Sequence, residues 1–317
     1  MRIGRAAGVT DTGRRRLRNE DAFICEPPLF AVADGMGGAR AGEIAAGLAA
    51  AALEEAGAET RGAEGVAELI AEANRRIWER SVADPRTAGM GTTVTAALVD
   101  AAAGTVAIGH VGDSRAYLYR DGELEQLTTD HSLVAELVQS GMLTPEEAER
   151  HPQRSAITRA LGTEETVDVE SFTVAAEPGD VFLLCSDGLS GMVADTDVAA
   201  VLGRSQDDLE RTADALIAAA NARGGDDNVT VVLFEIVADA VDPGRTDGEA
   251  TLTGVPTPVE APQPTETVEV EEAETEDAPS SARRRFGAGP GGRVAALLLI
   301  VAVLGLGLLA LYWAFTR

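Results

Sequence analysis

Four aspartates lie beside apolar runs of the sequence, at positions where a folded chain could hold several carboxylates in one site. Asp34 follows Phe-Ala-Val-Ala, and Asp187 follows Phe-Leu-Leu-Cys-Ser. Asp113 follows Ile-Gly-His-Val-Gly, and Asp227 directly precedes Asn-Val-Thr-Val-Val-Leu. Strand ends gathered at one edge of packed sheets would bring these carboxylates together, where they repel one another unless cations lie among them. Hard oxygen ligands, in a chain with only 3 histidines, favour Mg²⁺ or Mn²⁺ over zinc or copper. Two such ions a few ångströms apart suit phosphoryl chemistry.

The glycines that follow Asp34 support a binding role for this turn. Gly35, Gly37 and Gly38 would let the backbone pass close to a ligand or metal, where a Cβ atom would clash. An Asp-Gly pair alone is an ordinary turn. The recurrence of aspartates in similar settings is what indicates a site.

The elements that position these aspartates are strands and helices that occur in runs. Besides a buried strand before Asp34, the apolar pattern predicts strands over residues 92–99, 105–111, 115–119, 124–127, 181–185 and 228–237. It predicts helices over residues 41–56, 66–80, 196–202 and 208–222. Residues 131–161, broken by Pro145 and Pro152, are predicted to form an excursion outside the main sheets. Runs of this kind favour a layered α+β fold over a strictly alternating parallel fold.

Composition and charge exclude some classes of function. The chain has 317 residues, of which 45% are hydrophobic, and its formal net charge is -26. Such an acidic protein is a poor candidate for nucleic-acid binding, which depends largely on Lys and Arg, so we expect no nucleic-acid partner. Its 2 cysteines, Cys25 and Cys185, form neither a disulfide framework nor a zinc site and fit a reducing compartment.

The composition changes after the last predicted strand. Residues 1–239 are expected to form the folded domain, and 240–292 a disordered acidic Pro/Thr-rich linker with a basic end. Residues 293–315 are predicted to form a transmembrane helix, because 294–315 contain no charged residue and match the thickness of a bilayer. Four arginines precede the span and one follows it, which places the folded domain in the cytoplasm and residues 316–317 outside it. The predicted location is the cell membrane, with one span in the lipid bilayer.

Six ordered motifs, which contain these aspartates, resemble a known family. They lie at residues 16–21, 34–38, 91–93, 112–115, 186–189 and 225–230. Together they resemble the metal-dependent PP2C protein phosphatases in their bacterial serine/threonine form, over roughly residues 4–238. The tail resembles the membrane-anchored actinobacterial members, which are partners of receptor-like serine/threonine kinases. The resemblance implies two antiparallel sheets packed together and flanked by helices, with residues 131–161 as a flap beside the cleft.

The resemblance also implies an activity and a metal ligand set. The activity is hydrolysis of phosphoserine and phosphothreonine on proteins by a water that bridges two Mn²⁺ or Mg²⁺ ions. Asp34 would bridge both ions, the backbone carbonyl of Gly35 would bind one, and Asp187 and Asp227 would complete the pair. Asp113, with Asp187, resembles the ligand set of a third, weaker site. Phosphorylated proteins, including membrane serine/threonine kinases, are the expected partners.

Further residues carry roles by the same resemblance. Glu20 and Asp21 would hold metal-bound waters or lie just outside the ligand shell. Arg16 would grip the substrate phosphate, a role suited to a bidentate guanidinium. Many eukaryotic members have a histidine, a candidate general acid, where this chain has Met36. Methionine cannot donate a proton, so protonation of the leaving group has no assigned residue.

Three alternative functions fit the sequence less well than a metal-dependent phosphatase. Residues 112–114 (Gly-Asp-Ser) also resemble the nucleophile motif of a serine esterase family, but no histidine follows His151 to serve as its base. A pseudophosphatase that binds phosphoproteins without cleaving them would not need its metal carboxylates, and here all four are present. A membrane scaffold that uses only the linker leaves the aspartate pattern unexplained. His110 and His131 are expected to be structural.

Overall fold

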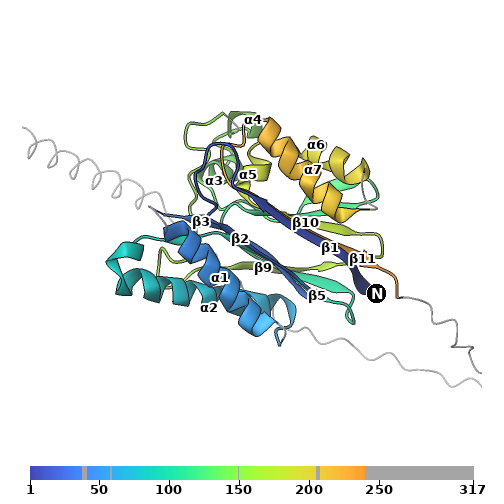
Figure 1. Cartoon of the computed structure of the whole chain (residues 1–317), viewed down its shortest axis with the longest axis horizontal. Coiled ribbons are helices and arrows are strands. Elements are labelled where there is room, and N and C mark those ends of the chain that lie inside the picture. The colour runs from blue at the N-terminus through green and yellow to red at the C-terminus, as the bar shows by residue number, and fades with distance from the viewer. Residues whose placement is uncertain (38–40, 58, 149, 205–207, 240–317) are drawn as a thin grey trace, which may run out of the picture. The chain divides into compact units, whose positions relative to one another are not determined.

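The computed structural model describes residues 1–37, 41–57, 59–148, 150–204 and 208–239 (Figure 1). The predicted linker, transmembrane helix and C-terminal tail lie outside these residues. Within the described part of the chain, no helix is both long enough and apolar enough to cross a membrane.

Two antiparallel sheets form the centre of the described domain. The first has the strand order β1–β11–β10–β7–β8, with bounds Arg2–Asp11 (β1), Val229–Val237 (β11), Val181–Cys185 (β10), Arg115–Arg120 (β7) and Glu123–Gln126 (β8). The second has the order β2–β3–β5–β6–β9, with bounds Asp21–Glu26 (β2), Leu29–Met36 (β3), Val94–Asp100 (β5), Thr105–Val111 (β6) and Glu170–Ala175 (β9). The short β4 (Gly91–Thr92) pairs with the end of β3.

Helices cover the outer face of each sheet, which gives four layers (Figure 1). The helices α1 (Ala41–Gly57) and α2 (Gly62–Ala83) cover the second sheet, while α6 (Asp195–Arg204) and α7 (Leu209–Ala222) cover the first. The short α3 (Leu133–Gln139) and α4 (Pro145–Ala148) lie in the excursion, α5 (Asp187–Ser190) follows β10, and the 3₁₀ turn η1 (Pro85–Thr87) follows α2. The predicted α+β architecture of two packed antiparallel sheets flanked by helices is therefore confirmed.

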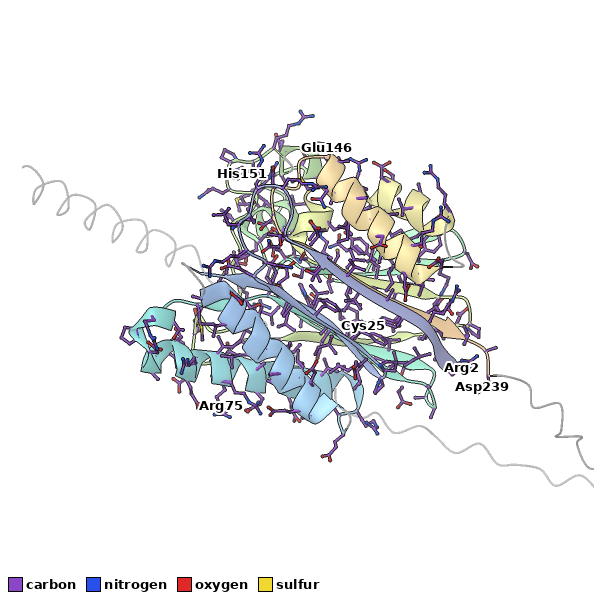
Figure 2. The ribbon with its side chains drawn as sticks, in the orientation of Figure 1. Arg2, Cys25, Arg75, Glu146, His151 and Asp239 are labelled. Atoms are coloured by element: carbon purple, nitrogen blue, oxygen red, sulfur yellow. The ribbon has the colours of Figure 1, made fainter. Side chains whose placement is uncertain are left out.

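Strand alternation explains how each sheet is apolar on both faces. In β3, Phe30 and Val32 face the other sheet, whereas Ala31 and Ala33 face α1. Phe234 of β11 stacks between Phe30 of β3 and Phe182 of β10. Its ring centroid lies 4.1 Å from that of Phe30 and 5.0 Å from that of Phe182. This aromatic column fills the space between the sheets. Figure 2 shows side chains filling the space between the two layers of strands, with Cys25 at their boundary.

The structure corrects several details of the predicted elements. The predicted strand over residues 92–99 is interrupted at Thr93, which separates β4 from β5. The expected end of the strand at Asp34 is wrong by two residues, because Gly35 and Met36 pair with β4. The strands β1, β2 and β9 were not predicted. In β1, Gly4 and Gly8 break the apolar pattern; a Cβ on Gly8 would lie 2.5 Å from the ring of Phe23, so glycine lets these layers meet.

Candidate active site

Five carboxylates, carried by the two sheets, form one cluster. Asp21 lies directly opposite Asp34 in the register of β2 and β3. Asp113 follows β6, Asp187 is the first residue of α5, and Asp227 lies just before β11. The charges of the other four all act on the Asp34 carboxyl group. The structure therefore brings together the four aspartates singled out in the sequence and adds Asp21 as a cross-strand partner.

Burial and mutual repulsion make these carboxyl groups difficult to ionise. Burial first, and then the charges of its neighbours, raise the pKa of Asp34 well above its usual value. Burial also raises the pKa of Asp21 to about 6, against hydrogen bonds from Thr230 and Ser186, and the pKa of Asp113 to about 7, with Asp187 as the next cause. Like charges directly opposite in a sheet are destabilising. Among the described residues, the cluster therefore holds more negative charge than its one ion-paired neighbour, Arg16, can balance.

The donor set fits divalent cations. Within the described residues, Asp21 and Asp187 each have one buried carboxylate oxygen without a hydrogen-bond partner. Burying such an atom costs free energy unless it gains a partner or a coordinated ion. At Gly35, a Cβ atom would lie 2.5 Å from the backbone oxygen of Glu20, so only glycine fits this close approach of backbones. Several carboxylate oxygens and backbone carbonyls are the ligands that Mg²⁺ and Mn²⁺ prefer.

Hydroxyl groups of the segment around β4 fix the position of Asp34. The Asp34 N–H donates to Thr93 Oγ1 at 3.1 Å, and its carbonyl accepts from Thr93 N–H at 2.9 Å and from Thr92 Oγ1 at 2.9 Å. Thr93 Oγ1 in turn shares a 2.6 Å hydrogen bond with Ser114 Oγ, next to Asp113. Sequence analysis included these threonines in a motif but assigned them no role, because their function depends on pairing between distant segments.

Asn228 connects the start of β11 to the loop between β1 and β2 (residues 12–20), which contains four arginines. Its Nδ2 donates to the carbonyls of Thr12 and Arg18 at 2.9 Å and 2.8 Å, and its Oδ1 accepts from the Glu20 N–H at 2.8 Å. Two residues further along the chain, Thr230 Oγ1 donates to Asp21 Oδ2 at 2.6 Å. Residues 228–230 thus hold the loop and the cluster together.

Arg16 lies beside the cluster, as predicted. Its Nη2 lies 2.6 Å from Asp227 Oδ2, and its side chain is 52% exposed. Arg15 instead pairs with Asp226 at 2.8 Å, and the Arg14 backbone N–H donates to Gly225 at 2.7 Å. Among the described ion pairs of these three arginines, the one that reaches a carboxylate of the cluster is that of Arg16. The role of Arg16 toward phosphate remains a prediction.

Glu20 and Met36 complete the predicted set. Burial raises the pKa of Glu20, and the charge of Arg16 opposes that shift. Met36 is half-buried at the end of β3, and its Cε lies against Gly91 of β4. The contact of Met36 with Gly91 therefore brings no proton donor to position 36.

A second cluster, formed by His110, His131 and Glu170, is structural. Its ligand atoms lie within 4.8 Å of one another, which resembles a metal site. However, Arg159 Nη1 lies 3.1 Å from His131 Nε2, so a guanidinium group already supplies positive charge there. His131 Nδ1 accepts from the Gly112 N–H at 3.1 Å, and the His131 N–H donates to the Gly112 carbonyl at 2.7 Å. His131 therefore fixes the start of the flap against the backbone next to Asp113.

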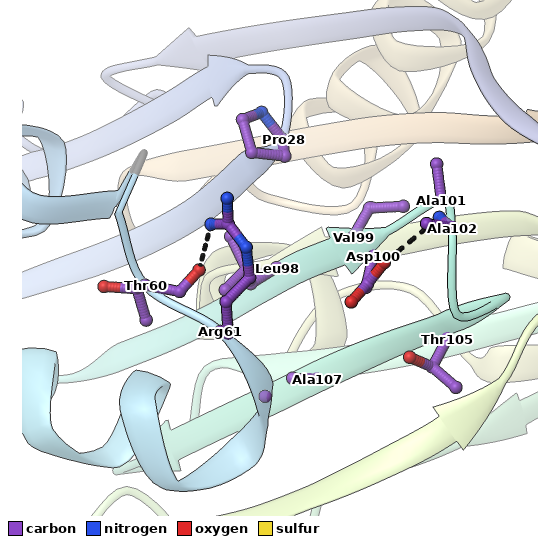
Figure 3. A pocket seen from close by; sticks show the side chains of 11 residues that line it. Pro28, Thr60, Arg61, Leu98, Val99, Asp100, Ala101, Ala102, Thr105 and Ala107 are labelled. Atoms are coloured by element: carbon purple, nitrogen blue, oxygen red, sulfur yellow. Dashed lines mark hydrogen bonds between the residues drawn. The ribbon is translucent and has the colours of Figure 1, made fainter.

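A cleft of about 810 Å³ adjoins the carboxylate cluster, since Asp113 and Asp187 line part of it. Its walls include α3 and α4 on one side and residues 190–194 on the other. A smaller pocket of about 310 Å³, between Pro28, Arg61 and Asp100, contains none of the cluster residues (Figure 3). The larger cleft is therefore the one associated with the candidate site.

Comparison with known proteins identifies close relatives. The sequence profile of the family described as "Protein phosphatase 2C" matches residues 13–229. The chain is 42% identical over 248 residues to the serine/threonine phosphatase stp of Listeria monocytogenes, covering 74% of this chain and 96% of the relative. It is 41% identical over 236 residues to the serine/threonine protein phosphatase PstP of Mycobacterium tuberculosis, covering 74% of this chain and 45% of that protein.

Solved structures agree with this relationship. The crystal structure of the Mycobacterium tuberculosis serine/threonine phosphatase PstP/Ppp matches with a TM-score of 0.70 and 40% identity, covering 74% of this chain and 100% of that one. The catalytic domain of PstP in complex with 2 manganese ions matches with a TM-score of 0.68 and 39% identity, covering 74% and 99% of the two chains.

Proposed function

This chain belongs to the protein phosphatase 2C family of serine/threonine phosphatases, and we propose that it hydrolyses phosphoserine and phosphothreonine on proteins with two divalent ions at the carboxylate cluster. The observation that carries the proposal is the cluster of five half-buried aspartates, in which Asp21, Asp34, Asp113 and Asp187 have raised pKa values and two carboxylate oxygens lack a hydrogen-bond partner. The manganese ions in the related PstP domain support Mn²⁺ or Mg²⁺ as the metal.

The residues that would hold the ions follow from the cluster. Asp34 and the carbonyl of Gly35 would bind from β3, and Asp187 and Asp227 from the opposite sheet, with Asp113 beside Asp187 at a third, weaker site. When bound, such ions would neutralise the carboxylates, polarise phosphoryl oxygens and supply a water of lowered pKa. Burial keeps these carboxylates at fixed positions before substrate arrives.

Two further carboxylates would act without binding an ion directly. Asp21, held by the Thr230 hydroxyl, faces Asp34 across the strand pair. Glu20, fixed through its backbone by Asn228, lies near Arg16. Both would accept hydrogen bonds from the waters that surround the ions and so orient them.

Arg16 would orient the phosphate. Its guanidinium group is half exposed and held at the cluster by Asp227. An incoming phosphate offers two oxygens to the same fork of N–H donors. Exchange of the carboxylate for the phosphate would then place the phosphorus atom over the cluster.

The position of Met36 leaves the leaving group without a side-chain acid. A serine or threonine alkoxide is a poor leaving group, and the methionine thioether has no proton to give. We assign the proton to a water in the cleft, held by the carboxylates described above.

Phosphate release from a phosphothreonine peptide, measured with Mn²⁺ and with excess chelator, tests the proposed reaction. Asp34→Asn and Asp227→Asn should each lower kcat by about a thousandfold or more, while Asp121→Asn, in an exposed turn, should change little. Full activity in chelator would refute the metal-dependent mechanism. Binding of the phosphopeptide without any release of phosphate would instead support a pseudophosphatase.

We also propose that the protein acts at the cell membrane and opposes receptor-like serine/threonine kinases there. Residues 294–315 contain no charged residue, and four arginines precede them, which supports a cytoplasmic catalytic domain. The full chain should float with vesicles of neutral lipid, and a chain cut before Arg283 should not. Flotation of both chains, or of neither, would contradict the proposed anchor.

A further inference from the structure

The helix α3 is apolar without having a buried side chain. Leu, Val and Ala occupy five positions of its sequence, Leu-Val-Ala-Glu-Leu-Val-Gln, yet none of its residues is buried. Ser132 caps its first turn by accepting the Ala135 N–H at 3.3 Å. Apolar side chains on a short helix are normally covered by another part of the protein, because their burial is the main source of helix stability.

One side of α3, whose apolar residues are half-buried, lines the 810 Å³ cleft. Val134, Ala135 and Val138 line it from α3, and Met192 and Val193, which follow α5, line it as well. A cavity of this size accommodates a small ligand or a few residues of a peptide. The helix α3 and the segment after α5 therefore both contribute apolar residues to the lining of this cleft.

The cleft is continuous with the candidate active site. Asp113 and Asp187, which belong to the carboxylate cluster, line the same cavity as α3. A phosphorylated residue at the cluster would therefore place its neighbours in the polypeptide at the mouth of the cleft. An extended chain advances about 3.3 Å per residue, so the side chains within a few residues of the phosphate are those that could enter.

Arg115 and Asp130, which both line the cleft, form an ion pair with each other. Arg115 donates to both carboxylate oxygens of Asp130 at 2.8 Å each and to Tyr117 at 3.0 Å. Gln126 Nε2 adds a contact to Asp130 at 3.3 Å. Because Arg115 and Asp130 are paired with each other, a charged ligand would have to break their contacts, whereas an apolar side chain would leave them in place.

We propose that this cleft binds an apolar side chain of the substrate, located within a few residues of the phosphorylated serine or threonine. The proposal rests on the phosphatase function proposed above and adds a substrate class to it: phosphoproteins with a large apolar residue flanking the phosphorylation site. The preference for an apolar flanking residue is determined by Val134, Val138 and Met192. Two of these residues belong to α3, so the flap contributes directly to substrate selection.

A peptide series tests the proposal with the full chain in detergent micelles and Mn²⁺. Each peptide has phosphothreonine in an otherwise alanine and serine sequence, with one leucine moved from four residues before the phosphothreonine to four residues after it. We expect leucine at one or two adjacent positions to raise kcat/KM about tenfold or more over alanine, mainly through KM, since an apolar pocket discriminates side chains to this extent. Equal kcat/KM across the series would overturn the proposal.

Variants of α3 locate the effect. Val138→Asp should abolish the leucine preference, and Val134→Thr, which keeps the shape of the side chain, should reduce it. Met142→Asp is the matched control, because Met142 is 67% exposed in the same flap and does not line the cleft. A leucine preference that survives Val138→Asp, or that Met142→Asp abolishes equally, would place the specificity elsewhere.

Hydrolysis of a small aryl phosphate separates the two proposals. Met142→Asp should not change it, because Met142 does not line the cleft, and Val138→Asp should lower it much less than it lowers kcat/KM for the leucine peptide, because an aryl phosphate carries no flanking side chain. If the parent protein fails to hydrolyse any phosphate ester with Mn²⁺, the proposed function itself fails. If Val138→Asp accelerates aryl phosphate turnover, or if turnover depends on protein concentration, another part of the chain or a second copy fills the cleft and the substrate proposal is wrong.

Discussion

Asp21→Asn should make the metal-free protein more stable, although it removes a residue of the active site. Asp21 lies directly opposite Asp34, and burial raises the pKa of Asp21 from 3.8 to about 6. Thr230 can still donate its hydroxyl to an asparagine oxygen, and the new amide N–H groups would take the place of the unpartnered Asp21 oxygen. The substitution thus removes a repulsion without removing the existing hydrogen bond.

The pKa of Asp21 sets the size and the pH range of the effect. Below pH 3.8 the group is protonated in both the folded and the unfolded state, so its ionisation contributes nothing. Between about pH 4 and pH 6 the unfolded state loses its proton first, and the folded state becomes less stable. One pKa unit corresponds to about 1.4 kcal/mol, so the loss levels off above pH 6 at about 3 kcal/mol. Metal-free Asp21→Asn should therefore exceed the parent in unfolding free energy by about 1–3 kcal/mol at pH 7.5, and by almost nothing at pH 4.

Urea unfolding of a fragment that ends at Asp239, the last residue that the structure describes, measures this difference. The parent and Asp21→Asn are compared in chelator at pH 4 and pH 7.5, with Asp121→Asn as the control for loss of one exposed charge. In saturating Mn²⁺ the order should reverse, because bound metal adds about 2.7 kcal/mol at a hundred times its Kd and the parent binds it more tightly. An asparagine variant that is no more stable than the parent in chelator at pH 7.5 would refute the repulsion argued for the cluster.

Three further predictions concern catalysis. Arg16→Ala should raise KM for phosphopeptides more than it lowers kcat, whereas Arg14→Ala should do little; the opposite ranking in steady-state kinetics would show that a different arginine grips the phosphate. Met36→His, if Asp34 stays in place, should raise kcat for phosphothreonine peptides relative to an activated aryl phosphate, since acid catalysis matters most for the poorer leaving group and can contribute roughly 10²–10⁴-fold. An unchanged ratio across pH would exclude this position as a proton source. A chain cut before Arg283 should keep the kcat of the full chain on small phosphopeptides, and a loss of activity would mean that the tail takes part in the fold or its regulation.

The aspartates of the site could be predicted because each has a local signal. Asp34, Asp187 and Asp227 lie within a few residues of apolar runs that form buried strands, so their positions at strand ends follow from the sequence pattern. Asp21 has a weaker signal, because its importance comes from its register opposite Asp34, and register is decided by pairing of whole strands.

Other features depend on contacts that no local pattern contains. The side chain of Asn228 contacts the backbone at three points of residues 12–20, which lie at least 208 positions away in the sequence, and its type alone does not indicate this role. The strand β1 carries glycine and arginine at several positions, so its apolar alternation is weak until its partner β11 is known. The apolar pattern of α3 is visible in the sequence, but only the structure reveals that its apolar side chains are no more than half-buried.

The aromatic column between the sheets also has a consequence for the choice of metal. Asp34 belongs to one sheet and Asp227 to the other, so ions held by both would cross-link the two halves of the sandwich. The separation of those halves is maintained by the stacked rings of Phe30, Phe234 and Phe182. Mg²⁺ demands nearly ideal octahedral geometry at short bond lengths, and small changes in ligand spacing alter its binding. We therefore expect Phe182→Leu, which changes no atom of the site, to shift the ratio of Mn²⁺ affinity to Mg²⁺ affinity.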